Sequence, residues 1–124
     1  MADYDYIEEY TWKGSGLKYA VNMTCEGFDM DTDDWTITVT RGNQSKEFTP
    51  SNSIQEVTET TPAGGGDPVV SSQWYICIDT NDFASGELYI TFDACVPDSD
   101  FPGGIRHEIQ EFLLTNLKKP KTKK

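Results

Sequence analysis

The stretch Trp35-Thr36-Ile37-Thr38-Val39-Thr40-Arg41 decides the fold of this chain. Apolar and polar side chains alternate along it, with Trp35, Ile37 and Val39 on one side and three threonines on the other. This period of two residues is typical of a β-strand with one face buried and one face in water. We therefore predict a strand whose tryptophan, isoleucine and valine point into a core.

Similar strand patterns lie on both sides of this stretch, over residues 17–23, 44–48, 73–78 and 87–96. Short strands of this kind, without internal repeats, predict an all-β fold. We expect a single immunoglobulin-like antiparallel β-sandwich with extended N- and C-terminal tails. The further residues expected to face inward are Leu17, Tyr19, Val21, Met23, Trp74, Ile76, Ile78, Leu88, Ile90, Phe92 and Ala94.

Two segments fit this scheme less directly. Residues 50–72 are dominated by Ser, Thr and Glu around a Gly-rich centre, which predicts a long connection, either a crossover between sheets or an exposed functional loop. Residues 106–117 have two interpretations. Helical spacing relates Ile105, Ile109, Phe112 and Leu113, whereas a poorer strand face would hold Ile105, His107, Ile109, Glu111 and Leu113.

Charge is distributed unevenly along the chain. The formal net charge is −11, which argues against nucleic acid as the main partner because phosphate binding needs a basic face. Residues 1–117 have a formal charge of −16, and the remaining seven residues carry +5. We assign residues 1–12 to an extended acidic arm, 13–117 to the β-sandwich domain and 118–124 to a basic tail.

The two tails are the candidate partner-binding segments. The basic tail is either a solvated end or a segment that docks on an acidic neighbour. Opposite charges at the two ends also predict head-to-tail contact between copies, which high salt would weaken. The expected anchors are Tyr4, Tyr6 and Tyr10 in the arm, and Lys118, Lys119, Lys121, Lys123 and Lys124 in the tail.

Cysteine usage and hydropathy indicate the compartment. The chain has three cysteines, an odd number at wide spacing, which is neither a disulfide framework nor a zinc signature. We interpret Cys77 and Cys95 as small apolar strand residues. The first six residues lack the features of a signal peptide, and no apolar run approaches membrane-spanning length. We expect a protein that folds in a reducing cytoplasm and has no membrane partner.

Enzymatic chemistry has little support in the sequence. His107 is the single histidine, so any Ser-His-Asp or Cys-His mechanism would depend on it. Its neighbours Arg106 and Glu108 are charged, and no nucleophile motif accompanies it. Acidic residues are so abundant that chance carboxylate pairs are no evidence for a glycosidase. We predict that the chain is not an enzyme and has no catalytic residues.

An acidic loop is the main candidate for cation binding. Asp29-x-Asp31-x-Asp33 has the opening spacing of a calcium loop. However, Asp34 and Thr40 occupy the positions where an EF-hand has glycine and glutamate. The prediction is an ordinary solvated turn, with no metal ligands and no cofactor.

Two further patterns resemble ligand-binding motifs only superficially. Gly64-Gly65-Gly66 lacks the Lys-Ser/Thr and the helix of a phosphate loop. Trp12, Trp35 and Trp74 would suit a sugar-stacking platform, but Trp35 and Trp74 occupy inward strand positions. We expect these two tryptophans in the core.

The second half of the chain resembles a known class of proteins. The carrying residues are Asp82-Phe83-x-x-Gly86-x-Leu88-x-Ile90 and Val96-Pro97-Asp98-Ser99-Asp100-Phe101-Pro102-Gly103-Gly104-Ile105-Arg106-x-Glu108. This pattern resembles small virion proteins of crAss-like tailed phages and, more loosely, the N-terminal β-sandwich of phage baseplate upper proteins. The resemblance covers roughly residues 74–114 and implies that a strand follows the Pro-Asp corner.

The resemblance implies a role in assembly. We expect a non-enzymatic virion structural protein, made in the host cytoplasm, of the head-fibre, tail-fibre or capsid-decoration kind. It would be a fibre or adaptor subunit that forms homo-oligomers, dimers or higher, and holds neighbouring virion proteins together. The main alternative is a free-standing binding module for carbohydrate, or one assisted by calcium, that uses Trp12 and residues 29–34.

Overall fold

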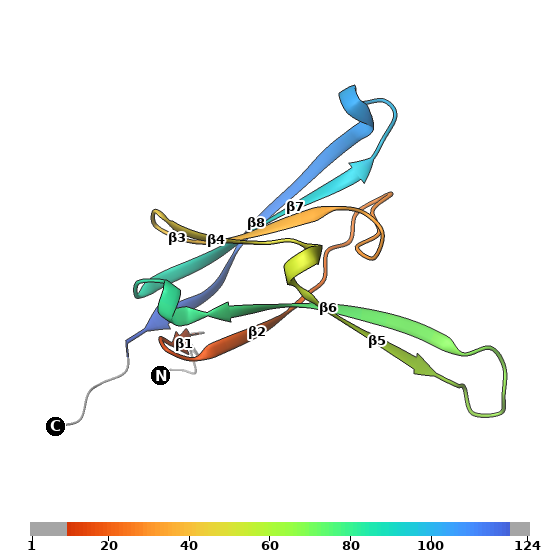
Figure 1. The fold of residues 1–124 in the computed structure, drawn as a ribbon, viewed down its shortest axis with the longest axis horizontal. Coiled ribbons are helices and arrows are strands. Elements are labelled where there is room, and N and C mark those ends of the chain that lie inside the picture. Colours follow the sequence, from red (N-terminus) through yellow and green to blue (C-terminus); the bar gives the residue numbers. More distant parts are fainter. Residues whose placement is uncertain (1–9, 120–124) are drawn as a thin grey trace, which may run out of the picture.

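The computed structural model of this protein describes residues 10–119 (Figure 1). No α-helix occurs in this part of the chain, and three short 3-10 turns, η1 to η3, join some of the strands. The all-β prediction is confirmed. The strands are β1 (Tyr10–Trp12), β2 (Gly16–Val21), β3 (Trp35–Arg41), β4 (Gln44–Phe48), β5 (Ile54–Thr60), β6 (Val69–Asp79), β7 (Gly86–Pro97) and β8 (Ile105–Lys118).

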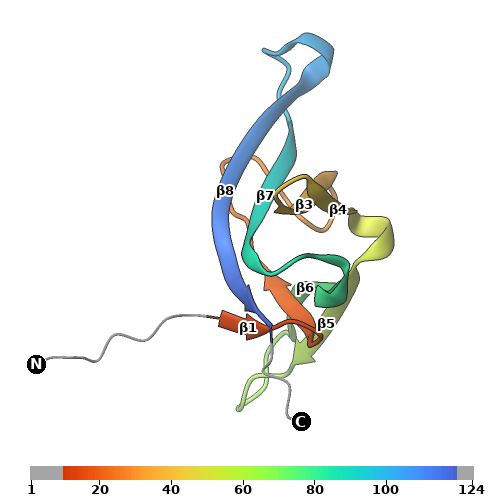
Figure 2. The ribbon, with the colours of Figure 1, turned by 90° about the vertical axis from the view of Figure 1, so that its left-hand side faces the viewer.

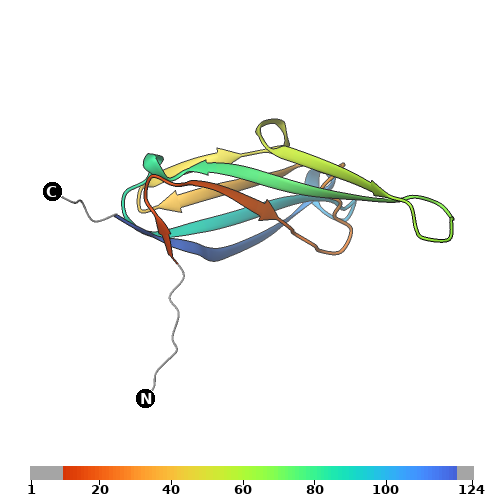
Figure 3. The ribbon, with the colours of Figure 1, turned by 90° about the horizontal axis from the view of Figure 1, so that it is seen from below.

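The strands form two sheets that pack together as a sandwich (Figures 2 and 3). One sheet has the order β1-β8-β7-β3-β4 and the other the order β2-β6-β5. In immunoglobulin domains, strands B, E and D share one sheet and strands C, F and G the other. The sheet β2-β6-β5 corresponds in order to strands B, E and D. In the other sheet, β3, β7 and β8 correspond to strands C, F and G, and β4 lies beside β3. The described pairs are antiparallel except β1–β8, which is parallel.

Trp35 stands at the centre of the core. Its ring, 1% exposed, stacks on Phe92 from β7 and meets Trp74 from β6 edge to face, with centroid distances of 5.8 and 5.3 Å. In antibody domains a disulfide packs against the tryptophan of strand C. In this chain Phe92 from one sheet and Trp74 from the other pack against Trp35 in place of a disulfide. All the residues that the alternation predicted to face inward are buried or half-buried.

Residues 50–72 contain more regular structure than the sequence predicted. The η1 turn (Pro50–Asn52) carries the chain from β4 in one sheet to β5 in the other. Strand β5 then pairs with β6, from Thr60 opposite Val69 to Ile54 opposite Tyr75. The crossover alternative is therefore confirmed, but the crossover is short and a β-hairpin occupies the rest of the expected long connection. The sequence pattern missed β5 because every residue of this strand is exposed, so no apolar alternation marks it.

Strand β8 resolves the ambiguity of the last element in favour of a strand. It pairs with β7 along nearly its whole length, with a β-bulge where Leu88 and Tyr89 meet Thr115 and Leu113. The β7–β8 hairpin projects beyond the sandwich at the top of Figure 1, and the β5–β6 hairpin projects at the right. The molecule thus has two protruding hairpins, one from each sheet.

The domain extends further at both ends than the sequence predicted. Tyr10–Trp12, assigned to the arm, form β1, because they pair with Asn116, Leu117 and Lys118 of β8. Lys118, assigned to the tail, is the last residue of β8. The boundaries therefore move from residues 13–117 to residues 10–118 in the described part of the chain.

Candidate functional site

The residues at which the two predicted partner-binding tails join the domain lie side by side. The Lys118 ammonium lies 4.8 Å from the centre of the Tyr10 ring, and the Lys13 amide donates to the Lys118 carbonyl at 2.8 Å. Tyr10 is 45% exposed, packs edge to face on Trp12, and Lys119 beyond the strand is exposed. The other predicted anchors, Tyr4, Tyr6, Lys121, Lys123 and Lys124, lie outside the described residues.

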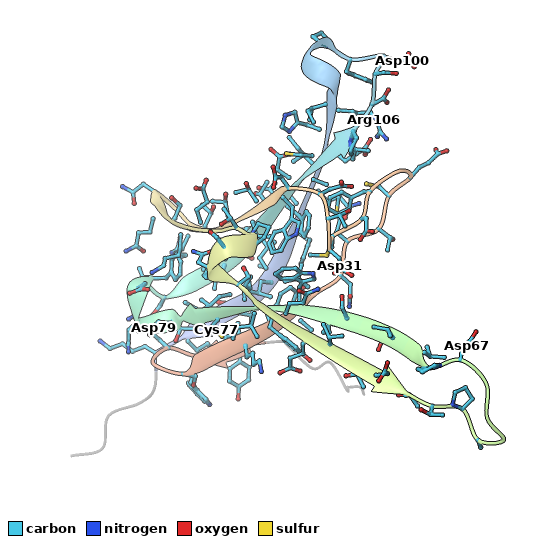
Figure 4. The ribbon with its side chains drawn as sticks, turned by 45° about the vertical axis from the view of Figure 1, so that its right-hand side comes forward. Asp31, Asp67, Cys77, Asp79, Asp100 and Arg106 are labelled. Carbon is cyan, nitrogen blue, oxygen red and sulfur yellow. The ribbon has the colours of Figure 1, made fainter. Side chains whose placement is uncertain are left out.

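The carboxylates of the acidic loop, residues 29–34, accept hydrogen bonds from other residues of the chain. Asp31 Oδ1 accepts hydrogen bonds from Ser72 at 2.7 Å, Trp74 at 2.9 Å and Gln55 at 3.1 Å. The bonds from Ser72 and Trp74, and then the one from Gln55, lower the pKa of the Asp31 carboxyl. Figure 4 shows Asp31 beside the strands of the β5–β6 hairpin. This residue ties the loop to that hairpin, which is a structural use of the carboxylate.

The neighbouring aspartates close turns in the same loop. Asp29 Oδ1 accepts the Asp31 amide at 2.9 Å, and Asp33 Oδ2 accepts the Asp29 amide at 2.9 Å. These three residues do not appear among the side chains whose ligand atoms converge in the described chain. The calcium-assisted alternative therefore gains no geometric support. The aromatic alternative keeps only Trp12, 45% exposed, because Trp35 and Trp74 are in the core.

The corner that carries the sequence resemblance is the tip of the β7–β8 hairpin, and its residues form hydrogen bonds with one another. Asp98 binds the Asp100 amide at 3.0 Å and the Arg106 guanidinium at 3.1 Å. Arg106 also pairs with Glu108, and it donates to the Glu26 carbonyl in the loop between β2 and β3 at 3.0 Å. Figure 4 shows Arg106 below the tip. Arg106 thus ties the β7–β8 hairpin to the loop between β2 and β3, while Asp98 and Glu108 hold its guanidinium.

The outer face of β8 is apolar at alternate positions along this anchored hairpin. Cross-strand pairing places Ile105, Ile109 and Leu113 on the face that points away from the core, opposite Pro97, Asp93 and Tyr89. Their exposed fractions are 39%, 63% and 48%. His107 and Glu111 lie between them on the same face. This set, Ile105, His107, Ile109, Glu111 and Leu113, is the strand face that the sequence offered, and we call it the β8 outer face.

The main-chain edge of β8 is largely unpaired in the described part of the chain. On the side away from β7, only Asn116, Leu117 and Lys118 have a strand partner, which is β1. From Ile105 to Thr115 this edge has no strand partner among residues 10–119. An exposed strand edge that also carries apolar side chains is a template for pairing with another strand.

Three residues outside the predicted sites come together on the same sheet face. Asp93, Cys95 and His107 have ligand atoms within 4.8 Å of one another, and His107 Nδ1 lies 2.8 Å from Asp93 Oδ1. None of these three residues was predicted to be a metal ligand. The signal was present in the alternation: Ala94 and Val96 face inward, so Cys95 must face outward. His107 joins it only through the register of the hairpin.

The interpretation of two cysteines as apolar packing residues needs correction. Cys77 is exposed, because its neighbours Ile76 and Ile78 take the inward positions of β6. Cys95 is half-buried on the outer face of β7. Burial, and then the charges of Asp93 and Asp34, raise the pKa of the Cys95 thiol. This shift is opposite in direction to the lowered pKa that activates a nucleophilic cysteine.

Comparison with protein-family models, with curated proteins and with solved structures found no match for this chain. A search of the described residues for a helix long and apolar enough to cross a membrane also found none.

Proposed function

We propose that this chain is a non-enzymatic assembly subunit that pairs with a second copy of itself through the free edge of β8. In the setting that the sequence resemblance implies, the assembly is a phage virion, and the chain is a fibre or adaptor subunit that holds neighbouring virion proteins together. The observation that carries the proposal is the self-complementarity of the β8 outer face.

Self-complementarity follows from the order of residues along β8. Two copies related by a two-fold axis present the same strand to each other, running in opposite directions. If the axis passes at Ile109, then Ile109 meets Ile109 of the other copy and Ile105 meets Leu113. His107 meets Glu111 in the same register, so a basic group faces an acidic one. Each cross-strand pair on this face is favourable, and no two like charges are directly opposed.

The apolar pairs supply the main stabilisation in this arrangement. The side chains of Ile105, Ile109 and Leu113 are 39–63% exposed in the single chain. Covering one such half-exposed side chain contributes on the order of 1 kcal/mol. Main-chain hydrogen bonds between the two edges add to this, as they do when a peptide strand joins a sheet. Together they offset part of the cost of association.

Salt distinguishes this arrangement from contact between the charged tails. The chain carries a formal net charge of −11, so two copies repel each other at low ionic strength. Salt screens this repulsion and leaves apolar contacts intact. Pairing through β8 should therefore be as strong or stronger at high salt, whereas head-to-tail contact between the acidic arm and the basic tail should weaken.

Sedimentation velocity of the purified protein over a range of concentrations tests the proposal. The wild-type chain should show a reversible dimer, and Ile109→Glu should be monomeric because two carboxylates would face each other at the axis. Val57→Glu is the matched control: Val57 is an exposed β5 residue, 61% exposed against 63% for Ile109. It should dimerise like the wild type. A wild-type chain that stays monomeric, or equal dimerisation of both variants, contradicts the proposal.

The virion setting has a separate test. Mass spectrometry of purified particles from the source of the gene should find the chain at a fixed copy number relative to the major capsid protein. Absence of the chain from particles would contradict the virion role and leave self-pairing to be judged by sedimentation alone.

A further inference from the structure

The antiparallel register of the β7–β8 hairpin brings three metal-binding side chains onto one surface. Asp93 and Cys95 are two residues apart on β7 and therefore point to the same side of the sheet. Cys95 lies directly opposite His107 on β8, so His107 points to that side as well. A carboxylate, a thiol and an imidazole thus converge on the outer face, supported by a hairpin whose β7 strand is buried on its inner face up to Val96.

The distances suit a single metal ion. Ligand atoms around tetrahedral zinc lie about 3.3–3.7 Å apart, given bonds of about 2.0–2.3 Å. The ligand atoms of Asp93, Cys95 and His107 lie within 4.8 Å of one another, and the closest given pair, Asp93 Oδ1 and His107 Nδ1, is at 2.8 Å. Small side-chain rotations on a fixed sheet would therefore bring all three to bonding distance.

The cluster is accessible and has a negative electrostatic bias. The side chains of His107 and Asp93 are 55% and 35% exposed, so an ion can reach them from solvent. The carboxylates of Asp93 and Asp34 lie close enough to Cys95 for their charges to act on its thiol. Negative charge that disfavours a bare thiolate favours a bound cation, because the ion neutralises it.

We propose that Asp93, Cys95 and His107 bind one divalent transition-metal ion, with Zn²⁺ as the natural candidate. A thiolate and an imidazole select borderline-soft ions over Ca²⁺ and Mg²⁺, which prefer oxygen ligands. The Cys95 thiol releases its proton to solvent when it coordinates. Three protein ligands leave the fourth tetrahedral position open towards solvent, for water or an incoming group. All three ligands come from one chain, so the site does not need a second copy; it shares His107 with the proposed β8 pairing.

Cobalt substitution tests the site directly, because Co²⁺ bound to a thiolate has a charge-transfer band in the near ultraviolet. The metal-free, reduced wild-type chain should bind one Co²⁺ with this band, and Zn²⁺ should displace it. Cys95→Ser should abolish the band, whereas the control Cys77→Ser, a change at an exposed cysteine of β6, should keep it. Asp93→Asn and His107→Ala should each weaken Zn²⁺ binding by more than roughly tenfold.

A second measurement uses the unmodified chain and does not depend on how a variant folds. Alkylation of the native protein, read by peptide mass spectrometry, should become slower at Cys95 when Zn²⁺ is added and stay unchanged at Cys77. A cobalt band that survives in Cys95→Ser, or equal alkylation of Cys95 with and without Zn²⁺, would overturn the proposal.

Discussion

The two protruding hairpins of this molecule are alike in shape, but they differ in how much of each packs against the rest of the domain. In the β7–β8 hairpin, inward residues of β7 are buried as far as Val96, where the loop between β2 and β3 packs against the strand near Gly27. Phe28 of that loop meets Phe92 edge to face at 6.3 Å, and its Glu26 carbonyl binds Arg106. In the β5–β6 hairpin, every β5 residue and the first three of β6 are exposed.

The difference shows which hairpin can present a fixed surface. A two-stranded ribbon with both faces in water is marginally stable, so the β5–β6 hairpin depends on its few tethers near the sandwich, chiefly Asp31. The inward residues of β7 belong to the core of the sandwich as far as Val96, and the tip is held by the Asp98–Arg106 ion pair. Binding residues are best held on rigid elements, and the β8 outer face meets that condition.

The largest contrast should come from the same truncation made in both hairpins. Val96→Ala, at a position 0% exposed near the tip of β7, should lower the free energy of unfolding by about 2 kcal/mol through lost packing. Val57→Ala, at 61% exposed in β5, should change it by less than about 0.5 kcal/mol. Urea denaturation of both variants measures the contrast. Equal losses would mean that the β5–β6 hairpin is packed as well as its counterpart.

Removal of the Asp31 tether should have the next largest effect. Asp31→Ala leaves the Trp74 indole N–H, which is part of a buried side chain, without its acceptor and should cost about 1–2 kcal/mol. Hydrogen exchange should then speed up in β5 and the start of β6 and stay unchanged in β7. If exchange rises equally in both hairpins, Asp31 supports the whole domain and not one hairpin.

The Asp31 tether should also be sensitive to pH. Its pKa is lowered in the folded chain, so its contribution is present above the ordinary aspartate pKa and is lost as the pH falls through the lowered value. The loss should be small because the residue is exposed and solvent screens it. In denaturation series over the acid range, the stability gap between wild type and Asp31→Asn should narrow as the pH falls. A constant gap would contradict this assignment.

The smallest effect is expected at the exposed ion pair of the β5–β6 side. Lys18 lies 3.2 Å from Glu56, and both side chains are about half exposed, at 50% and 53%. Lys18→Ala should cost less than about 0.5 kcal/mol, and the cost should shrink in high salt. Denaturation at two salt concentrations measures it. A larger, salt-independent cost would show that the stem of Lys18 packs against Tyr75, over whose ring its ammonium lies at 4.5 Å.

The sequence predicted the buried half of the fold well. Alternation around Trp35 and along β7 marks strands whose one face is buried, and those faces are the core. No apolar alternation marks β5, because both faces of this strand are exposed. The strand is held by main-chain pairing with β6. Strand β1 was missed for a related reason: three residues are too few to show a period.

The candidate sites were less predictable than the fold. Tyr10 and Lys118 were chosen for charge and ring chemistry, and their mutual contact depends on a parallel β1–β8 pair that no local pattern signals. The Asp93, Cys95 and His107 cluster depends on the register of a hairpin whose turn length the sequence did not define. Residues that a fold brings together from different strands are visible only when the pairing is known.

A disulfide trap at position 109 tests the self-pairing of β8 most directly. With the three native cysteines changed to serine, Ile109→Cys should form a covalent dimer quickly under mild oxidation, because the pair across the two-fold axis would have Cβ atoms about 4.5–5.5 Å apart. Val57→Cys, equally exposed on the other hairpin, should react slowly. If the two variants cross-link at the same rate, the two copies do not pair through β8.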